Sequence, residues 1–525
     1  MAHRTGFLPL LFSLLFVTSP LQAQPAQQEF PEEISITVEE AIQLAIVNNY
    51  LLRKGLLDRE LADAQIREAW GSVYPQVNAS GSYNRNILSP NPFAGSDAGG
   101  LFGLFGSLEW LAYNERARTD GDSSTEPIDM DEFFERQQDG YQEAGITQQG
   151  GDNPFAVDNT FNAGVSITQT IYNGAAFAAI KGARQFKQMS EDQLARDQQI
   201  VVDQIRSAFY SALLAREQVQ VLRSSVGRLQ KTVEETRAAV EAGVLSRYDR
   251  MSAEVELVNL ETNLIEAENQ AELAVKNLTL QLGIPVQTTV QLRGELAYRE
   301  ELYPEITDIE SAYRLALERR PDISQTDAYL DLLEINNQIT RARYLPTVNA
   351  FANTAYVGQV PDNRRTVSQV EGEDFQYTST NRGFFDDSYW YPSMAVGLQF
   401  QWSLFNGFQT RELVQQGRIE LKQAEIDHEQ QKNGVYIEVD QALRALDNAT
   451  RRIRSQQRNI EQAEANYENA RRRLQEGVGT SMEERQASSL LDQSQLNYLS
   501  AVHDFLTAVS RYETATGKPV LAGQP

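Results

Sequence analysis

Two stretches of the chain alternate apolar and polar residues over about ten positions. The first is centred on Val165, and the second extends from Met394 to Leu404. In both, apolar side chains share one face and polar side chains share the other, which is the period of two of a half-buried strand. Partner strands with weaker alternation are predicted near Val77 to Arg85 and near Val348 to Tyr356. The pattern therefore predicts four strands.

Both strongly alternating stretches end at an Asn-Gly pair, after which the apolar period becomes helical. No proline interrupts either helical region, so nothing forces a break. The first long helix, from Ala175 to Ala242, would form a rod of about 100 Å. The residues that recur every seven positions are Ile205, Ala212, Val219, Val226, Val233 and Val240, and in the second helix Val439, Leu446, Ile453, Ile460, Tyr467 and Leu474. A strict seven-residue repeat predicts supercoiled packing against other helices.

Each long helix is followed by a glycine turn and a shorter return helix. These return helices extend from about Tyr248 to Gly283 and from about Met482 to Gly517. A short helical pair opens each half of the chain, and we expect it to stack end to end with the return helix and so complete the rod.

The same order of elements occurs twice, which indicates an internal duplication. Ile36 to Leu52 corresponds to Ile306 to Ile323, and "PQVNA" at Pro75 corresponds to "PTVNA" at Pro346. We therefore divide the chain into a first repeat (24–285), an inter-repeat linker (286–305) and a second repeat (306–525).

Long inserts, 87–158 and 358–392, separate the two strands of each repeat. They are far longer than ordinary hairpin loops, and we expect them to be irregular and to project outside the cell. The part from Gly99 to Tyr113 is apolar enough to pack over a barrel mouth or touch lipid. The acidic part from Thr119 to Phe133 is expected to be solvated.

Residues 1–23 resemble a secretory signal peptide, with a basic start, an apolar stretch and a small-residue cleavage site; an N-terminal membrane anchor is the alternative. The chain contains no cysteine, so disulfides and thiolate metal sites are excluded. Beyond the signal, only His428 and His503 remain; both are interpreted as helix-surface residues, and they do not suggest a metal site.

The net charge of −25 argues against binding to nucleic-acid backbones. No later segment is apolar for 18 residues, which argues against a helical membrane bundle. No nucleophile, base and orienting group cluster at a recognisable spacing, and there is no phosphate-binding loop. The chain is therefore predicted to be neither an enzyme nor a cofactor-binding protein.

The alternating strands fit a transmembrane β-barrel, whose strands need about 9–11 residues with apolar outer and polar inner faces. Four strands cannot close a barrel, and open sheet edges do not persist in hydrocarbon, so several copies must each contribute four. A soluble β-sandwich beside a coiled coil is the alternative, but it leaves the signal peptide and the paired long helices unconnected.

With these features, the sequence resembles the TolC family of outer membrane efflux proteins. The duplication, the four strands, the paired long helices and the turns "GVL" and "GVGT" carry the resemblance. It implies an α+β membrane protein: a homotrimer with a twelve-stranded barrel in the outer membrane of a Gram-negative bacterium, continuous with an α-helical tunnel in the periplasm. It also implies a periplasmic adaptor and an inner-membrane pump or ABC transporter as partners.

The resemblance further places a gate and adaptor-docking positions where the long and return helices meet. The docking turns correspond to Gly243, Val244, Leu245, Gly477, Val478, Gly479 and Thr480. The gate hypothesis assigns the constriction to Asp249, Glu483 and Glu484, held shut by Tyr248, Arg250 and Arg485. The alternatives are left-handed helix caps at both glycines and solvated charges at the helix tips.

One difference from the family concerns ion selectivity. The family's paired aspartates after the second turn are replaced here by Arg485 and Ser488, which puts a strongly cation-selective ring in doubt. The predicted function is a passive outer membrane channel-tunnel for small molecules or secreted substrates, in a tripartite efflux or type I secretion system. The alternative is an outer membrane structural or adhesive protein with surface loops.

Overall fold

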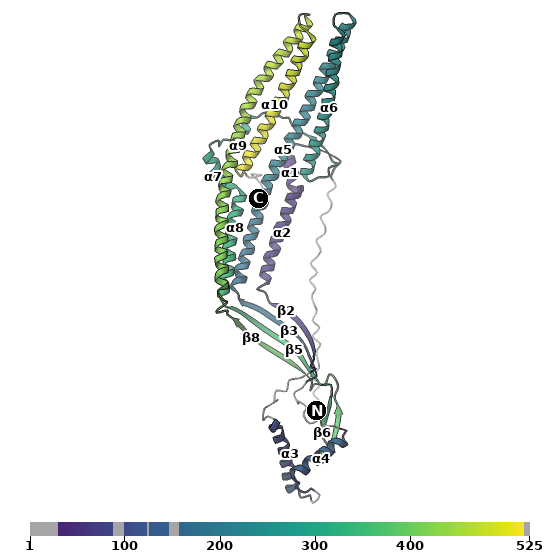
Figure 1. The fold of residues 1–525 in the computed structure, drawn as a ribbon, viewed down its shortest axis with the longest axis vertical. Helices are drawn as coiled ribbons and strands as arrows, with labels where there is room; N and C mark the ends of the chain where they lie inside the picture. Colours follow the sequence, from purple (N-terminus) through teal and green to yellow (C-terminus); the bar gives the residue numbers. More distant parts are fainter. Residues whose placement is uncertain (1–29, 88–98, 123–124, 146–156, 519–525) are drawn as a thin grey trace. The chain divides into compact units, whose positions relative to one another are not determined.

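The computed structural model describes residues 30–87, 99–122, 125–145 and 157–518 (Figure 1). The predicted signal peptide lies outside these residues. The chain divides into two compact units, each assembled from both predicted repeats. One unit contains segments 1–61, 187–328 and 425–525, and the other contains 62–186 and 329–424.

The second unit contains the four predicted strands as one antiparallel sheet. The strands are β2 (Gln76–Arg85), β3 (Asn159–Tyr172), β5 (Thr347–Val360) and β8 (Trp390–Gln401). Their order in the sheet is β2-β3-β5-β8. Among the described residues, β2 and β8 pair with no further strand and are therefore open edges.

The register of the sheet aligns the apolar positions of all four strands on one face. Val77 lies opposite Ile167, Ile167 opposite Ala352, and Ala352 opposite Val396. One residue along, the aligned set is polar or small: Asn78, Ser166, Asn353 and Ala395. Because side chains alternate along a strand, the whole sheet has one apolar face and one mainly polar face.

Aromatic side chains mark both ends of the apolar face. At one end, the ring centroids of Tyr83 and Phe161 are 4.7 Å apart, and those of Phe161 and Trp390 are 5.5 Å apart. Towards the end of β8, the centroids of Phe400 and Trp402 are 6.5 Å apart. Paired aromatic groups flanking an apolar band are typical of strands that cross a membrane.

The long helices are α5 (Gly174–Glu241) and α9 (Gln409–Gln475), of 68 and 67 residues. Asn173 caps α5, because its side-chain oxygen accepts from the backbone N–H groups of Ala175 (3.1 Å) and Ala176 (3.2 Å). In the second repeat, Gly407 and Phe408 have φ values of 65° and 64°, and α9 begins after them. The change of period at Asn-Gly is thus the boundary between sheet and helix.

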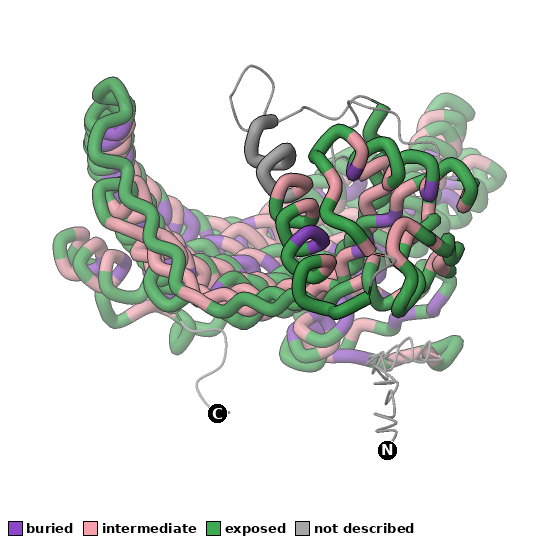
Figure 2. The backbone as a smooth tube through the Cα atoms, turned by 90° about the horizontal axis from the view of Figure 1, so that it is seen from below, coloured by how far each residue is buried: buried purple, intermediate pink, exposed green. Residues whose placement is uncertain are grey.

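Most of the predicted heptad positions are buried and form seams along these helices, whereas Val240, Ile460, Tyr467 and Leu474, nearer the turns, are only partly buried. Ile205, Ala212, Val439 and Leu446 are fully buried. Figure 2 shows buried residues recurring along the helical tube, separated by exposed ones. The return helices α6 (Arg247–Leu282) and α10 (Ser481–Ala515) have 36 and 35 residues, about half the length of their partners, as predicted.

The short helical pairs are α1 (Val38–Asn48) with α2 (Tyr50–Gly71), and α7 (Ile309–Arg319) with α8 (Pro321–Arg341). Their junctions meet the ends of the return helices. Gly283 has φ +75°, and a β-carbon there would lie 2.2 Å from the carbonyl oxygen of Asn48. Gly517 has φ +72°, and a β-carbon there would lie 2.8 Å from the carbonyl carbon of Arg319, at the α7–α8 junction. The predicted stacking is therefore present in both repeats, and it requires glycine.

The predicted inter-repeat linker contains a strand. β4 (Thr289–Leu292) pairs in parallel with β1 (Glu33–Ile36), and a 3₁₀ turn, η1 (Glu300–Leu302), follows. Arg216 of α5 donates to the carbonyl oxygens of Leu292 (2.8 Å) and Gly294 (2.7 Å). These bonds fasten the segment between the repeats to the first long helix.

The prediction of irregular inserts is wrong. The first insert contains α3 (Gly99–Thr119) and α4 (Met130–Glu143), and the second contains the hairpin of β6 (Arg365–Gln369) and β7 (Tyr377–Asn381). The aromatic rings of Tyr113, Phe133 and Phe375 lie 5.1–5.7 Å apart and form a small shared core. Because both inserts supply rings, each is ordered by the other.

The assignment of His428 to a helix surface is also wrong, whereas His503 is partly exposed on α10. His428 is 4% exposed, with its Nδ1 3.5 Å from the carboxylate of Asp327. His503 is half-buried, and its Nε2 lies 3.1 Å from the hydroxyl of Ser211. Each histidine faces a neighbouring helix, and the residues around it in the sequence do not indicate which helix that is. No described helix is long and apolar enough to cross a membrane, and the described residues contain no metal-binding group of His, Cys, Asp or Glu.

Candidate functional site

The turns between long and return helices are two closely similar left-handed caps. Gly243 and Gly477 have φ values of +77° and +76°. The N–H of Val244 donates to the carbonyl oxygen five residues earlier, at 2.9 Å, and Val478 makes the corresponding bond at 3.0 Å. These bonds satisfy carbonyl groups at the ends of α5 and α9, so both glycines terminate their helices as the cap interpretation requires.

Two of the predicted gate carboxylates cap the return helices. Asp249 accepts hydrogen bonds from the N–H (3.1 Å) and the hydroxyl (2.7 Å) of Ser246. The hydrogen bond from the Ser246 hydroxyl lowers the pKa of Asp249 most, and the bond from the Ser246 backbone N–H lowers it further. Glu483 forms the equivalent capping box with Thr480. Both groups are acidic residues in a first helical turn, where the helix dipole also favours negative charge.

The apolar side chains of the turns project into solvent. Val244 is 76% exposed, Val478 is 67% exposed, and Tyr248 at the start of α6 is 78% exposed. Leu245 and Gly479 are only partly exposed. The predicted docking turns therefore present one apolar side chain each at the tip of a helical hairpin.

The two predicted gate arginines have different environments. Arg250 contacts Glu254 of its own helix at 3.6 Å. Arg485 of α10 instead reaches α6, where its Nη1 donates to Glu256 at 3.0 Å and to the hydroxyl of Ser252 at 3.5 Å. Arg485 thus joins the α5–α6 hairpin to α10, whereas Arg250 remains within the first hairpin.

Glu484 is not at the surface. The residue is 6% exposed, and one carboxyl oxygen lies 3.4 Å from the hydroxyl of Thr232 on α5. Burial raises the pKa of Glu484, and hydrogen bonds with Thr232 and with Tyr467 of α9 oppose the rise. The solvated-charge interpretation is therefore wrong for this residue. It is a contact between three helices.

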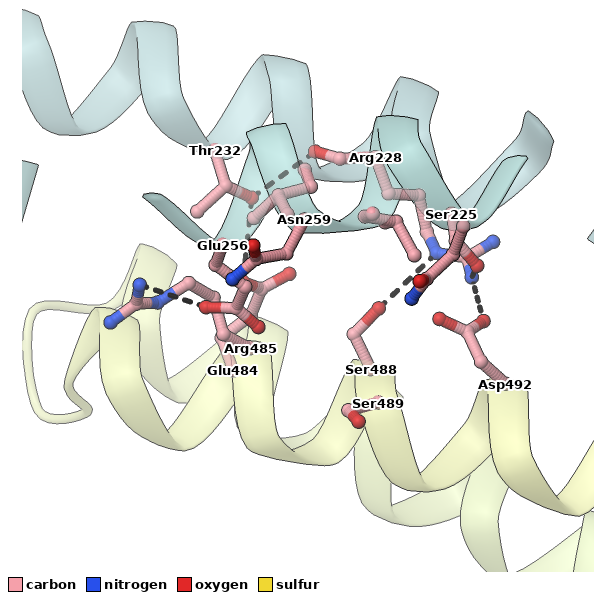
Figure 3. A pocket seen from close by; sticks show the side chains of 13 residues that line it. Ser225, Arg228, Thr232, Glu256, Asn259, Glu484, Arg485, Ser488, Ser489 and Asp492 are labelled. Carbon is pink, nitrogen blue, oxygen red and sulfur yellow. Dashed lines mark hydrogen bonds and ion pairs between the residues drawn. The ribbon is translucent and has the colours of Figure 1, made fainter. Parts of the chain in front are cut away.

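A polar cavity of about 210 Å³ lies beside Glu484 and Arg485, between α5, α6 and α10 (Figure 3). At its far end, Arg228 forms an ion pair with Asp492 and donates to the hydroxyls of Ser488 (3.3 Å) and Ser225 (3.0 Å). Its lining is Ser225, Arg228, Leu229, Thr232, Glu256, Asn259, Leu260, Asn263, Glu484, Arg485, Ser488, Ser489 and Asp492. We call this set the polar layer.

Sequence reasoning identified only Glu484 and Arg485 of this layer, plus Ser488 as a departure from the family. A signal for the rest does exist. Ser225 and Thr232 lie seven residues apart, each one position before a heptad valine, and both are buried. A polar pair at heptad spacing on a buried face indicates that a partner helix supplies hydrogen bonds there. The identity of that partner is a property of the fold.

The model of the outer membrane efflux protein family matches residues 139–284 and 312–518. The chain belongs to the outer membrane efflux protein family. The two matched segments include all residues of the polar layer and both turns.

Among relatives of this chain, the alkaline protease secretion protein AprF of Pseudomonas aeruginosa is 20% identical over 71% of this chain and 73% of its own length. The cobalt-zinc-cadmium resistance protein CzcC of Cupriavidus metallidurans is 26% identical over 33% of this chain and 40% of its own. The fold is similar to that of the CmeC outer membrane channel of Campylobacter jejuni, with a TM-score of 0.67, 15% identity and coverage of 91% and 85%. It is also similar to CusC, with a TM-score of 0.65, 16% identity and coverage of 91% and 92%.

Proposed function

We propose that this efflux protein is one protomer of a homotrimer and forms a passive exit duct through the outer membrane of a Gram-negative bacterium. Three four-stranded sheets would close a twelve-stranded barrel, and the helical hairpins would continue the bore through the periplasm. The observation that carries this proposal is the sheet with one apolar face and aromatic ends, whose two edges have no partner strand among the described residues. Such edges require partner strands when the sheet lies in hydrocarbon.

Exposed apolar residues on the return helix support assembly with further copies. Met251, Val258 and Ile265 of α6 recur every seven residues, and all three are exposed. This spacing forms a helical seam that nothing in the described chain covers. Closure of the barrel already requires neighbouring protomers, and we propose that one of them covers this seam.

We propose a periplasmic adaptor and an inner-membrane pump or ABC transporter as further partners. The exposed side chains of Val244 and Val478 support docking at the two turns, at the ends of the hairpins. The partners would supply the energy for transport. The relatives' names refer to protease secretion and to metal resistance, so the proposed cargo is small molecules or secreted proteins.

We propose that the constriction lies at the same end, with Asp249, Glu483 and Glu484 as its carboxylates and Tyr248, Arg250 and Arg485 holding it shut. The contact of Arg485 with Glu256 supports a closing role for that residue, because it links two hairpins. The burial of Glu484 supports an internal role, in the packing behind the constriction. Asp249 and Glu483 are closer to the turns and are the better placed of the three to face a passage.

Two measurements test the duct. The mass of the detergent-extracted protein should equal three chains, and the protein should conduct ions in planar bilayers. Arg485→Gln should raise the time-averaged conductance by about tenfold if about 1.4 kcal/mol of closing contact is lost. Arg472→Gln removes an exposed arginine of α9 and should leave conductance unchanged. A stable monomer, or a trimer without conductance, contradicts the proposal, and the second result favours an adhesive role.

A further inference from the structure

Glu484 is a buried carboxyl group without an ion-pair partner in the described part of the chain. The residue is 6% exposed, and its carboxyl group accepts a hydrogen bond from the hydroxyl of Thr232 at 3.4 Å. A carboxylate ion buried without a counter-ion is strongly unfavourable, whereas a neutral carboxyl group needs only ordinary hydrogen bonds.

The neighbouring arginines do not neutralise Glu484, because other carboxylates engage them. Arg228 pairs with Asp492, and Arg485 pairs with Glu256 at 3.0 Å. The charged or titratable groups facing Glu484 are Arg228 and Glu235 on α5, Glu256 on α6, Tyr467 and Arg471 on α9, and Arg485 and Asp492 on α10. Glu235 adds like charge to the site, while Arg471 adds a weaker opposite charge.

The cavity beside Glu484 gives the charged form of the group a place to obtain water. It holds about 210 Å³, which is room for several water molecules. The Nε of Arg485, a residue 8% exposed, has no hydrogen-bond partner among the described groups. Polar lining and an unsatisfied buried donor are the conditions under which a cavity takes up water.

We propose that Glu484 is a proton-binding site that couples pH to the cohesion of the α5–α6 and α9–α10 hairpins. With its proton, Glu484 is neutral and packs between Thr232 and Tyr467, and the hairpins stay together. Without it, the carboxylate requires hydration from the cavity, and α10 separates from α5. The inference rests on the proposed function, since it assigns closure to these hairpin tips.

The direction of the effect follows from the pKa of Glu484, which burial raises above its ordinary value. Such a group stabilises the packed state fully below the ordinary pKa, and this contribution is lost as pH rises through the folded pKa. Acid therefore tightens the hairpin contact, and neutral or alkaline pH loosens it. Burial also raises the pKa of Asp492, and its hydrogen bond with Ser225 and its contact with Arg228 limit that rise.

The test uses the full-length channel in planar bilayers between about pH 5 and about pH 8. Wild-type time-averaged conductance should rise by about tenfold with pH, the factor carried by one pKa unit. Glu484→Gln, which mimics the protonated group, should stay at the low level throughout. Glu468→Gln removes an exposed carboxylate of α9 one residue from Tyr467 and should titrate like the wild type. Thr232→Val removes a hydrogen bond that stabilises the charged form, so its midpoint should move to higher pH.

Backbone hydrogen exchange of α5 and α10, measured on the same samples, does not depend on conduction. It should rise with pH in the wild type and in Glu468→Gln but not in Glu484→Gln. A wild-type pH response retained in Glu484→Gln overturns the inference while leaving the duct intact. A wild-type channel that never conducts overturns the proposed function, and the exchange data alone then decide whether Glu484 binds the proton.

Discussion

The buried arginine at the α7–α8 junction gives the sharpest stability prediction. The Arg320 side chain is 3% exposed and contacts Asp322 at 2.7 Å and Glu438 at 2.6 Å. It also donates to the carbonyl oxygen of Ala515 at the end of α10, at 3.3 Å. Arg320→Met keeps most of the apolar volume, removes the charge and leaves two carboxylates facing each other.

The magnitude follows from what remains after the substitution. Breaking a buried ion pair costs about 3–5 kcal/mol. Glu438 is 45% exposed, so water screens its part of the loss, and Arg196 stays 3.9 Å from both carboxylates. We therefore expect a loss of about 3 kcal/mol, at the lower end of that range. In a chain of 525 residues, an unfolding entropy of about 2.1 cal/mol/K per residue converts this loss into a decrease in Tm of roughly 3 °C.

Thermal unfolding of the detergent-solubilised protein measures this loss, with all variants heated at one scan rate because unfolding of such assemblies is often irreversible. Arg319→Met is the matched control, since it removes an exposed arginine from the adjacent position. A Tm for Arg320→Met within about 1 °C of this control would refute the reasoning, because desolvation would then offset the attraction.

The pH dependence provides a second check on the same cluster. Burial alone would raise the pKa of Asp322, but its hydrogen bond and charge contact with Arg320 outweigh burial and lower it. A group with a lowered folded pKa stabilises the protein above its ordinary value, and this contribution is lost as pH falls through the folded pKa. The difference in Tm between wild type and Arg320→Met should therefore shrink in acid.

The remaining predictions concern a helix junction, the gate and the inserts. Gly283→Ala combines a left-handed backbone with a clash against the α1–α2 junction and should cost about 3 kcal/mol by thermal unfolding, whereas Gly243→Ala, with open space, should cost about 1 kcal/mol. Asp249→Asn keeps a capping oxygen but loses its charge, and unchanged conductance and ion preference would remove Asp249 from the constriction. Gly140→Ala places a β-carbon 1.9 Å from the carbonyl oxygen of Phe375, so protease sensitivity of the inserts should rise while conductance stays constant; equal protease sensitivity would contradict this packing.

The long helices and the sheet were predictable because their signals are local and repeated. A heptad residue such as Ile205 or Leu446 carries little information alone, but six in register identify a buried seam. The alternation near Val396 likewise identifies the apolar face without knowledge of the neighbouring strand. Helix lengths followed from the positions of the turn glycines.

The inserts were mispredicted because tertiary packing overrides local propensity there. α3 contains four glycines, a composition that disfavours a helix. At Gly106, however, a β-carbon would lie 2.9 Å from the ring of Phe134 in α4. The glycine therefore permits α3 and α4 to pack closely. This packing stabilises α3, but it cannot be predicted from the sequence of α3 alone. β1 and β4 were missed because four residues carry too little alternation and their partner lies in the other half of the chain.

The gate region was only partly predictable, since the turn and its caps are local but the polar layer is not. Asp249 and Glu483 follow a serine and a threonine at capping-box spacing, a pattern that is visible in the sequence. Glu484 follows Glu483 directly and has the same local appearance. Its burial depends on Thr232, which lies in the other repeat, 252 positions away.

The shared aromatic core of the inserts limits how this surface can change during evolution. Tyr113 and Phe133 come from one repeat and Phe375 from the other, so replacing either insert alone would leave the remaining rings uncovered. The two segments must then be inherited, exchanged or grafted as a pair. A chimaera that carries both inserts of this chain should display them folded, whereas a chimaera with only one should display an exposed apolar segment prone to cleavage.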